Sequence, residues 1–230
     1  MNNLFSLEGR IALVTGSAQG LGHTVARGML DAGAKVVLND VSAASLERAQ
    51  AALRAEGFEV PAYAFDITHE RGVTEAVSAI EREVGPIDIL VNNAGIHRRN
   101  PLIDMPVEDW RRVIDVNLSG AFIVGRAVAR GMIARRRGKI INIASINARM
   151  VRPNIGNYCA AKGGIVTLTK SMATEWGEYN VNVNAIGPGF FLTDLTRSLA
   201  DDPDFDAWVR SEVPLRRWGE PGDLVGWGWR

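Results

Sequence analysis

RIALVTGSAQGLG, at residues 10–22, is the most informative stretch of the chain. A short apolar run leads into glycines at positions 16, 20 and 22, and a helical pattern follows at once. Gly16 permits a tight turn, while Gly20 and Gly22 let the backbone approach a pyrophosphate at the positive N-terminal end of a helix. A strand, a glycine-rich turn and a helix in this order predict a dinucleotide-binding unit.

An acidic residue, Asp40, follows 18 positions after Gly22, at the end of the next apolar run. A carboxylate there accepts hydrogen bonds from the adenosine ribose hydroxyls and repels a 2′-phosphate. Like charges about 4 Å apart cost at most about 4 kcal/mol at an effective dielectric near 20. No basic residue stands at Ser17, Gln19 or Val41 to offset this repulsion. The pattern favours NAD and leaves NADP as the second possibility; a loop start or a helix cap is the alternative role for Asp40.

Short apolar, β-branched segments alternate with helical patterns along the whole chain. The expected strands are residues 10–16, 34–40, 60–66, 87–95, 138–145 and 181–186. The expected helices are residues 20–33, 42–57, 70–85, 106–138 and 157–179. Continuous rather than alternating apolar runs indicate a sheet that is covered on both faces. The chain is therefore predicted to form an α/β fold with a single doubly wound parallel sheet, Rossmann-like, in the strand order 3-2-1-4-5-6.

The composition excludes several classes of protein. Basic and acidic residues balance at 26 each, so nothing draws the chain generally to nucleic acid or to an anionic membrane. No apolar run approaches the roughly 18 residues that span a bilayer. The single cysteine forms no internal disulfide, and the opening MNNLFSLEGR lacks the apolar core of a secretory signal. We therefore expect a cytoplasmic protein in which residues 1–230 form a single dinucleotide-binding catalytic domain.

NYCAAKGG, at residues 157–164, places a tyrosine and a lysine four positions apart. On a helix Tyr158 and Lys162 share a face, so the hydroxyl and the ammonium group are expected to meet. A free tyrosine ionises near pH 10, and a fixed cation within about 4–6 Å favours the phenolate. The pair predicts a tyrosine with a lowered pKa that is suited to acid–base chemistry. The alternative is an ordinary amphipathic helix with an exposed lysine.

Together the motifs resemble those of the short-chain dehydrogenase/reductase family, from about residue 7 to residue 225. The motifs that carry the resemblance are TGSAQGLG (15–22), FDIT (65–68), NNAG (92–95), DVNLSG (115–120), NIAS (142–145), YCAAK (158–162) and GPGFFLT (187–193). Each motif alone occurs by chance in unrelated proteins, whereas the whole set in this order and at this spacing is strong evidence for the family. The resemblance implies an oxidoreductase that moves a hydride between a nicotinamide cofactor and a secondary alcohol or ketone.

The resemblance assigns roles to four residues. It implies that Tyr158 is the general acid/base and that Lys162 lowers its pKa while binding the nicotinamide ribose. It also implies that Ser145 holds the substrate oxygen and that Asn117 supports a proton-relay water. The chemistry requires similar groups, because a proton leaves as the hydride departs and charge on the oxygen must be held. A plain strand-end cap for Ser145 and a helix-kink residue for Asn117 are the alternatives.

The resemblance also implies a set of cofactor contacts. Asp66 and Ile67 would face adenine, and Thr193 would contact the nicotinamide amide. Asn93 would hold the adjoining backbone or the cofactor, although an Asn pair at a strand end is also an ordinary turn. The full set of expected cofactor contacts is Gly16, Gln19, Gly20, Leu21, Gly22, Asp40, Asp66, Ile67, Asn93, Tyr158, Lys162 and Thr193.

Two adjacent arginines follow the fourth expected strand, in GIHRRNP at residues 95–101. Loops beyond the carboxyl ends of the strands carry substrate contacts in open α/β sheets. Arg98 or Arg99 can grip a carboxylate in bidentate fashion, which supplies the local anion attraction that the balanced net charge does not. We predict Arg98, Arg99 and Ser145 as substrate contacts. A solvated basic turn or a subunit contact is the alternative for the arginines.

Three segments narrow the expected substrate within the family. The GIHRRNP loop, LADDPDFDAWV (199–209) and PLRRWGEP (214–221) resemble those of gluconate 5-dehydrogenases, which are also 5-keto-gluconate reductases. The resemblance implies D-gluconate and 5-dehydro-D-gluconate as the substrate pair. The 2-dehydro-3-deoxy-gluconate dehydrogenases come second, and 3-oxoacyl thioester reductases, which usually use NADP and lack the arginine pair, come third. Residues 201–214 invite the interpretation of a lid over the substrate.

Metal and thiol chemistry are not expected. His23 and His97 lack the acidic or histidine neighbours of a metal site, so we predict no required metal. Cys159 is interpreted as a packed small residue, because Tyr158 already accounts for the chemistry.

The closing sequence GDLVGWGWR departs from the family pattern after about residue 225. We expect a truncated or altered C-terminus in which the last strand of the family is missing. The strand at 181–186 would then be an exposed edge with one uncovered apolar flank, which Trp227 and Trp229 would partly cover. This interpretation implies a homo-oligomer that forms only a dimer, or a protein that partly aggregates. A nucleotide-binding protein with little turnover is the alternative function.

Overall fold

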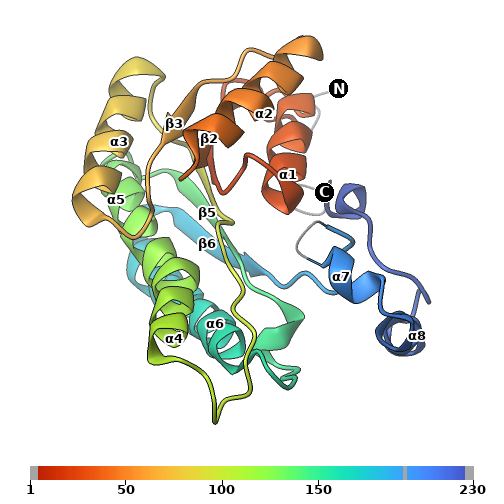
Figure 1. Ribbon diagram of the computed structural model, residues 1–230. Coiled ribbons are helices and arrows are strands. Elements are labelled where there is room, and N and C mark those ends of the chain that lie inside the picture. Colours follow the sequence, from red (N-terminus) through yellow and green to blue (C-terminus); the bar gives the residue numbers. More distant parts are fainter. Residues whose placement is uncertain (1–4, 194–195, 226–230) are drawn as a thin grey trace.

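Six parallel strands form the centre of the fold (Figure 1). The computed structural model describes residues 5–193 and 196–225. The strands are β1 (Ile11–Thr15), β2 (Lys35–Asp40), β3 (Ala62–Ala64), β4 (Ile89–Asn92), β5 (Gly138–Ile143) and β6 (Val181–Ile186). Their order in the sheet is β3-β2-β1-β4-β5-β6. The predicted α/β fold, parallel sheet and strand order are confirmed.

Helices connect the strands and cover both faces of the sheet. The main helices are α1 (Gly20–Asp31), α2 (Ala43–Ala55), α3 (Glu70–Glu83), α4 (Val107–Ile114), α5 (Gly120–Ala134), α6 (Gly156–Trp176), α7 (Arg197–Ala200) and α8 (Pro203–Glu212). The short helical turns are η1 (Asp115–Ser119), η2 (Ile146–Ala148), η3 (Gly177–Tyr179) and η4 (Pro221–Leu224). The π-helical turn η1 divides the long helix expected at residues 106–138. Figure 1 shows α7 and α8 beyond the carboxyl end of β6, apart from the other helices.

The core lies on both faces of the sheet because the strand residues alternate in direction. Leu13 pairs with Val37 and Leu90, Leu90 pairs with Ile140, and Ile140 pairs with Val183. This buried row packs in one cluster with residues of α3, α5 and α6. The neighbouring strand residues pack on the opposite face against α1 and α2. Burying a large aliphatic side chain contributes about 1.5–3 kcal/mol, so these rows stabilise the sheet that positions the loops.

Buried asparagines join the strands near their carboxyl ends. Asn92 donates to the Asn142 Oδ1 atom at 2.9 Å and to the Ala121 carbonyl at 3.2 Å. Asn142 in turn donates to the Thr169 hydroxyl at 2.9 Å. Satisfied buried polar networks fix a single arrangement of the groups they connect. The bonds therefore hold β4, β5, α5 and α6 together beneath the loops that carry the predicted site.

The last strand, β6, lies at the edge of the described sheet, as expected. Val181 and Val183 are buried, whereas Asn182 and Asn184 are exposed. The expected apolar flank is limited to the end of the strand, where Ala185 is exposed and Ile186 is half-buried, because residues 181–184 alternate valine with asparagine. Residues 226–230, with Trp227 and Trp229, lie outside the described residues. The altered C-terminus and the dimer stay predictions.

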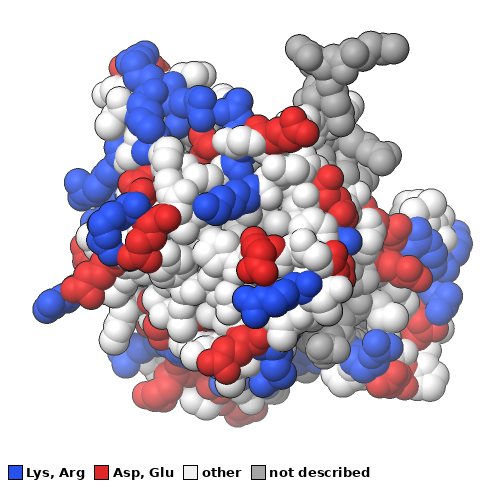
Figure 2. Space-filling model, turned by 90° about the horizontal axis from the view of Figure 1, so that it is seen from above, with Lys and Arg blue, Asp and Glu red and all other residues white. Residues whose placement is uncertain are grey.

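Charges are mixed on the surface. Figure 2 shows basic and acidic side chains interspersed over most of the face that it presents, with a group of basic side chains at its upper left. Within residues 5–193 and 196–225, no helix has the length and apolar character needed to cross a membrane.

Candidate active site

A cavity of about 400 Å³ lies at the carboxyl ends of the strands. This position is where open α/β sheets bind ligands, and the volume is within the usual range for small-molecule sites. The predicted site residues that line it are Gly16, Gln19, Gly20, Leu21, Gly22, Asp40, Asp66, Ile67, Asn93, Arg99, Ser145, Tyr158, Lys162 and Thr193. Arg98 and Asn117 are the two predicted residues outside its lining. Residues from many separate segments are thus brought to one site.

The glycine-rich turn has no room for side chains at two positions. Gly16 has a φ of +63°, and a Cβ atom there would lie 2.8 Å from the Ala94 Cα atom. A Cβ atom on Gly22 would lie 2.2 Å from the Gly16 carbonyl oxygen and 2.3 Å from the Asn93 Nδ2 atom. The turn leads into the first turn of α1, whose N-cap residue Gln19 makes no side-chain cap. The backbone N–H groups of that helix end are a ready site for a phosphate group, so the turn fits a dinucleotide.

Asn93 holds this turn in place. Its Nδ2 atom donates to the carbonyl oxygens of Thr15 and Gly16, both at 3.0 Å. The backbone N–H groups of Asn93 and Ala94 donate to the Thr15 hydroxyl at 3.0 and 3.2 Å. Of the two roles expected for Asn93, the structure shows the contact with the adjoining backbone. The ends of β1 and β4 are thereby fixed to one another.

The acidic residues lie at one end of the cavity, after β2 and β3. Asp40 ends β2, and one of its carboxylate oxygens accepts from the Ser42 backbone N–H at 3.1 Å. Asp66 accepts from the backbone N–H and the hydroxyl of Thr68 at 2.8 and 2.7 Å. Burial opposes ionisation of Asp66, but these bonds and the nearby Arg112 outweigh it and hold its pKa below the usual value. Asp66 is therefore held as a carboxylate at this end of the cavity.

Tyr158, Ser145 and Lys162 come together at the other end of the cavity. Tyr158 and Lys162 lie on α6, two and six residues after its start at Gly156. Ser145 follows β5 and caps η2, where its hydroxyl accepts from the Asn147 N–H at 3.1 Å. The Ser145 side chain also forms a hydrogen bond with Tyr158. The predicted residues therefore share a site, and the capping role expected as the alternative for Ser145 exists beside it.

The electrostatics of the pair differ from the prediction. Burial raises the pKa of Tyr158 above its usual value, and the hydrogen bond with Ser145 only partly offsets this. The Lys162 Nζ atom lies 5.6 Å from the centre of the Tyr158 ring and donates to the Ile143 carbonyl at 2.5 Å. The expected lowering of the tyrosine pKa by Lys162 is therefore not found, because burial dominates the pKa of the phenol. Burial itself lowers the pKa of Lys162 to about 8.

Asn117 lies outside the cavity lining and binds the backbone of a loop that borders the cavity. It is buried in the π-helical turn η1, and both ends of its amide bind the backbone of Ile96. The Oδ1 atom accepts from the Ile96 N–H at 2.7 Å, and the Nδ2 atom donates to the Ile96 carbonyl at 2.9 Å. Asn117 thus lies at a helix irregularity, as the alternative held, and it fixes the loop after β4. Such π-helical turns often occur at functional sites. Its support of a relay water stays a prediction.

The two predicted arginines have different surroundings. Arg99 lines the cavity, whereas Arg98 does not. The Arg98 Nε atom lies 3.6 Å from an Asp109 carboxylate oxygen, and its Nη1 atom donates to the His97 carbonyl at 3.2 Å. Of the pair, the structure brings Arg99 to the site and pairs Arg98 outside it.

His97 and Arg152 are among the lining residues that were not assigned to the site from the sequence. The His97 ring stacks on that of Tyr158, with ring centres 3.8 Å apart. Burial, followed by the charges of Arg99, Lys162 and Arg152, lowers the pKa of His97 to about 4, so the ring is neutral at physiological pH. The position of each residue in the sequence was the one feature that could have indicated its place in the site. His97 adjoins the arginine pair, and Arg152 lies between Ser145 and Tyr158.

The described part of the chain contains no cluster of side chains that could bind a metal ion. Within residues 5–193 and 196–225, no group of three or more His, Cys, Asp or Glu side chains is placed to hold a metal ion. Cys159 is buried and has no disulfide partner.

Comparisons with known proteins agree with this geometry. The family model for short chain dehydrogenases matches residues 10–204. The gluconate 5-dehydrogenase of Gluconobacter oxydans (strain 621H) is 47% identical over 97% of this chain and 88% of the relative. The 2-dehydro-3-deoxy-D-gluconate 5-dehydrogenase of Formosa agariphila is 46% identical over 97% of this chain and 86% of the relative.

A solved structure extends the agreement to three dimensions. It is that of a gluconate 5-dehydrogenase from Burkholderia cenocepacia J2315 in complex with NADP and tartrate. It matches with a TM-score of 0.94 and 45% identity over 97% of this chain and 88% of that chain. The glycine-rich turn, the Ser145, Tyr158 and Lys162 cluster and these matches lead to one conclusion: the chain belongs to the short-chain dehydrogenase family.

Proposed function

We propose that this protein is an oxidoreductase that interconverts D-gluconate and 5-dehydro-D-gluconate with a nicotinamide dinucleotide as cofactor. The observation that carries the proposal is the shared cavity of the glycine-rich turn and the Ser145, Tyr158 and Lys162 side chains. A dinucleotide that lies with its pyrophosphate at the start of α1 and its adenosine near Asp40 extends toward Tyr158. The reactive end of the cofactor then meets the acid–base residue.

The side chains at this end fit the chemistry of a secondary alcohol. The cofactor, when bound, supplies the acceptor or donor of the hydride. Ser145 holds the substrate oxygen through its hydroxyl, and Tyr158 accepts the hydroxyl proton during oxidation and returns it during reduction. Lys162 places a positive charge beside the oxygen on which negative charge develops. The bond between Ser145 and Tyr158 brings both groups to the same substrate atom.

The charge distribution in the cavity supports an acidic substrate. Among the described lining residues, the carboxylates are those of Asp40 and Asp66, both at the proposed adenosine end. Around Tyr158 the charged lining residues are the cations Arg99, Arg152 and Lys162. A sugar acid places its carboxylate among these cations. The names of the Gluconobacter and Burkholderia relatives, and the tartrate in the Burkholderia structure, support a hydroxy acid of this kind.

A substrate panel tests the function. The purified protein is incubated with NAD⁺ and with D-gluconate, 2-dehydro-3-deoxy-gluconate or a neutral hexitol, and the absorbance at 340 nm is followed. We expect the fastest rise with D-gluconate. A faster rise with 2-dehydro-3-deoxy-gluconate would assign the chain to the second candidate function, which the Formosa relative supports. Binding of NAD⁺ in a calorimeter without a rise for any sugar acid would contradict the proposal and favour a nucleotide-binding protein of little turnover.

Asp40 predicts a preference for NAD over NADP. Its carboxylate lines the cavity at the end of β2 and would repel a 2′-phosphate. We expect kcat/KM with NAD⁺ to exceed that with NADP⁺ at least about tenfold, since about 1.4 kcal/mol of the repulsion is enough for that ratio. Asp40→Ser should remove most of this preference by improving the use of NADP⁺.

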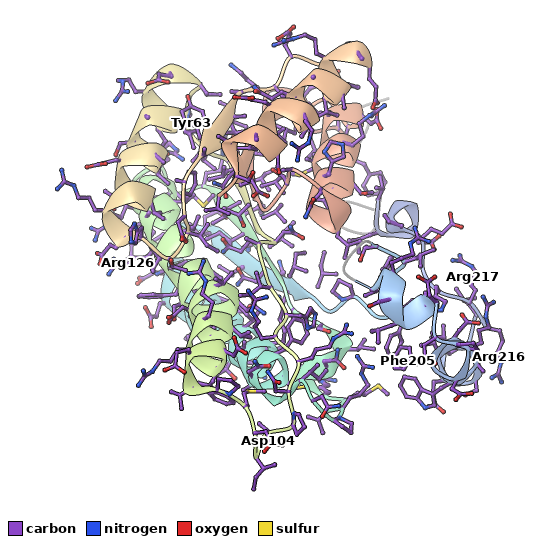
Figure 3. All side chains as sticks on the ribbon, viewed as in Figure 1. Tyr63, Asp104, Arg126, Phe205, Arg216 and Arg217 are labelled. Carbon is purple, nitrogen blue, oxygen red and sulfur yellow. The ribbon has the colours of Figure 1, made fainter. Side chains whose placement is uncertain are left out.

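Asp104→Asn is the matched control for this experiment. Asp104 lies outside the cavity lining, on the loop that precedes α4 (Figure 3). Its replacement should leave the cofactor ratio unchanged. A wild-type preference for NADP⁺, the cofactor of the Burkholderia structure, would contradict the assignment of Asp40 to the ribose hydroxyls.

A further inference from the structure

Arg152 is a cation of the cavity whose side chain has no hydrogen-bonding or ion-pair partner among the described residues. It lies between η2 and α6, and its side chain is partly buried. The Nε atom is shielded from solvent and forms no hydrogen bond. Among the described residues no carboxylate lies within ion-pair distance of its guanidinium group. A half-buried charge without a hydrogen-bonding partner is costly, so a site that keeps one is built to receive an anion.

Aromatic rings hold the guanidinium group of Arg152. It lies 4.9 Å from the centre of the Phe205 ring and 5.4 Å from that of the Phe190 ring. Phe190 follows β6, and Phe205 comes from α8, the segment that lies apart from the main layers in Figure 3. Arginine stacks favourably on aromatic faces while the N–H groups at its edge stay free. The rings thus orient a planar donor group without using its hydrogen bonds.

The electrostatic surroundings of Arg152 also favour an anion. Burial, and then the charge of Arg99, lower the pKa of Arg152 from its usual value. Two guanidinium groups near one another repel, and an anion between them converts the repulsion into attraction. Tyr158 is also close enough for its charge to affect the pKa of Arg152. An anion bound by Arg152 would therefore lie near Tyr158, at a distance that one sugar-acid molecule can span.

We propose that Arg152 binds the carboxylate of the sugar acid and that Phe205 positions its guanidinium group, so that α8 contributes to the recognition of acidic substrates. The proposal rests on the proposed function, because the carboxylate is that of the substrate named there. It differs from the prediction for Arg98 and Arg99, since Arg98 is paired with Asp109 and Arg99 is exposed. Arg99 adds positive charge, while the partly buried and stacked Arg152 forms the bidentate contact.

The test compares Arg152→Gln and Arg152→Lys with the matched control Arg149→Gln, at an exposed arginine three positions away that lies outside the cavity lining. Two readouts are used: the kcat and KM for D-gluconate and for a neutral hexitol, and the dissociation constant of tartrate for the NAD-saturated protein by calorimetry. Hydrogen bonds to charged groups contribute about 1.5–3 kcal/mol, which corresponds to about 10- to 100-fold. We expect Arg152→Gln to raise the KM for gluconate and the tartrate dissociation constant by this factor, with kcat changed much less.

The controls separate recognition from folding. The hexitol KM and the NAD dissociation constant should not change in Arg152→Gln, and Arg149→Gln should behave as the wild type. Arg152→Lys should recover only part of the affinity, because lysine lacks the planar pair of donors. An unchanged gluconate KM in Arg152→Gln, or an equal loss for gluconate and the hexitol, would overturn the proposal.

The role of Phe205 is tested with a double-mutant cycle. Phe205→Leu should raise the gluconate KM in the wild-type background and have no further effect in the Arg152→Gln background. Additive effects would overturn the positioning role. If the wild type oxidises no sugar acid, the proposed function fails and the tartrate measurement still decides: loss of tartrate binding in Arg152→Gln alone supports the anion site, and absence of tartrate binding by the wild type refutes it.

Discussion

Lys162 carries a buried ammonium group whose hydrogen bond in the described structure is to the Ile143 carbonyl. Burial lowers its pKa from 10.5 to about 8. The unfolded chain therefore keeps this proton up to about pH 10.5, whereas the folded chain releases it near pH 8. Between these values the unfolded state binds more protons, so the stability of the fold rises with pH in that window. Below pH 8 the buried charge destabilises the fold.

Lys162→Met tests this prediction because it keeps the length of the side chain without its charge. Between pH 7 and pH 10 the free energy of unfolding of the wild type should rise by about 2–3 kcal/mol relative to that of the variant. Urea denaturation at four pH values measures the difference. Lys170→Met, at an exposed position of the same helix, is the control that removes one lysine charge outside the site. A flat difference for Lys162→Met would mean that the ammonium group is not desolvated.

The identities of Ser145, Tyr158 and Lys162 could be predicted from motifs, but their electrostatics could not. Helical spacing places Tyr158 and Lys162 on one face, and the structure keeps them there. Whether the lysine touches the phenol depends on the length of its side chain and on the carbonyl of Ile143, which comes from another segment. His97 and Arg152 were not assigned for the same reason: their roles arise from neighbours that are distant in the sequence.

The turn from β1 to α1 was the most predictable element, because only glycine fits the close contacts at Gly16 and Gly22. Gly22→Ala would place a methyl group 2.2 Å from the Gly16 carbonyl oxygen and 2.3 Å from the Asn93 Nδ2 atom. Both neighbours are held by hydrogen bonds, so the backbone of the turn has to shift. We expect a loss of about 1–3 kcal/mol in stability and at least about a tenfold loss in NAD affinity.

Gly72→Ala is the control for this substitution. Gly72 lies in α3, and a Cβ atom there would find its nearest neighbour at 3.8 Å. Alanine in place of a helical glycine should raise stability by about 0.5–1 kcal/mol and leave NAD binding unchanged. Calorimetry with NAD⁺ and urea denaturation measure both variants. Wild-type NAD affinity in Gly22→Ala would show that the cofactor does not lie against this turn.

Other elements could not be predicted in detail. The helical pattern at residues 106–138 is continuous; Asn117 was considered as a kink residue, but the π-helical form of the turn η1 was not predicted. That turn is explained by the buried amide of Asn117, which binds the backbone after β4. Likewise residues 201–214, which include α8, were interpreted only as a lid, and the contact of Phe205 with Arg152 depends on how α8 folds back toward the cavity.

The arrangement of the whole chain followed from the alternation of apolar runs and helical patterns. Parallel strands connected by right-handed crossovers place all carboxyl ends at one edge of the sheet. The order β3-β2-β1-β4-β5-β6 then brings the glycine-rich turn after β1 next to the loop after β4, and the Ser145 segment follows on β5. The cavity that unites them is a property of this topology, although its residues are scattered from Gly16 to Leu199.

The central claim is that Tyr158 exchanges the proton while the cofactor and a sugar acid lie in this cavity. The most direct measurement is the rate of NADH formation from NAD⁺ and D-gluconate by the wild type and by Tyr158→Phe, with NAD⁺ affinity measured in parallel. General acid–base groups typically contribute about 10²- to 10⁴-fold, so we predict a loss of that size in kcat with unchanged NAD⁺ affinity. Wild-type turnover by Tyr158→Phe would contradict the account.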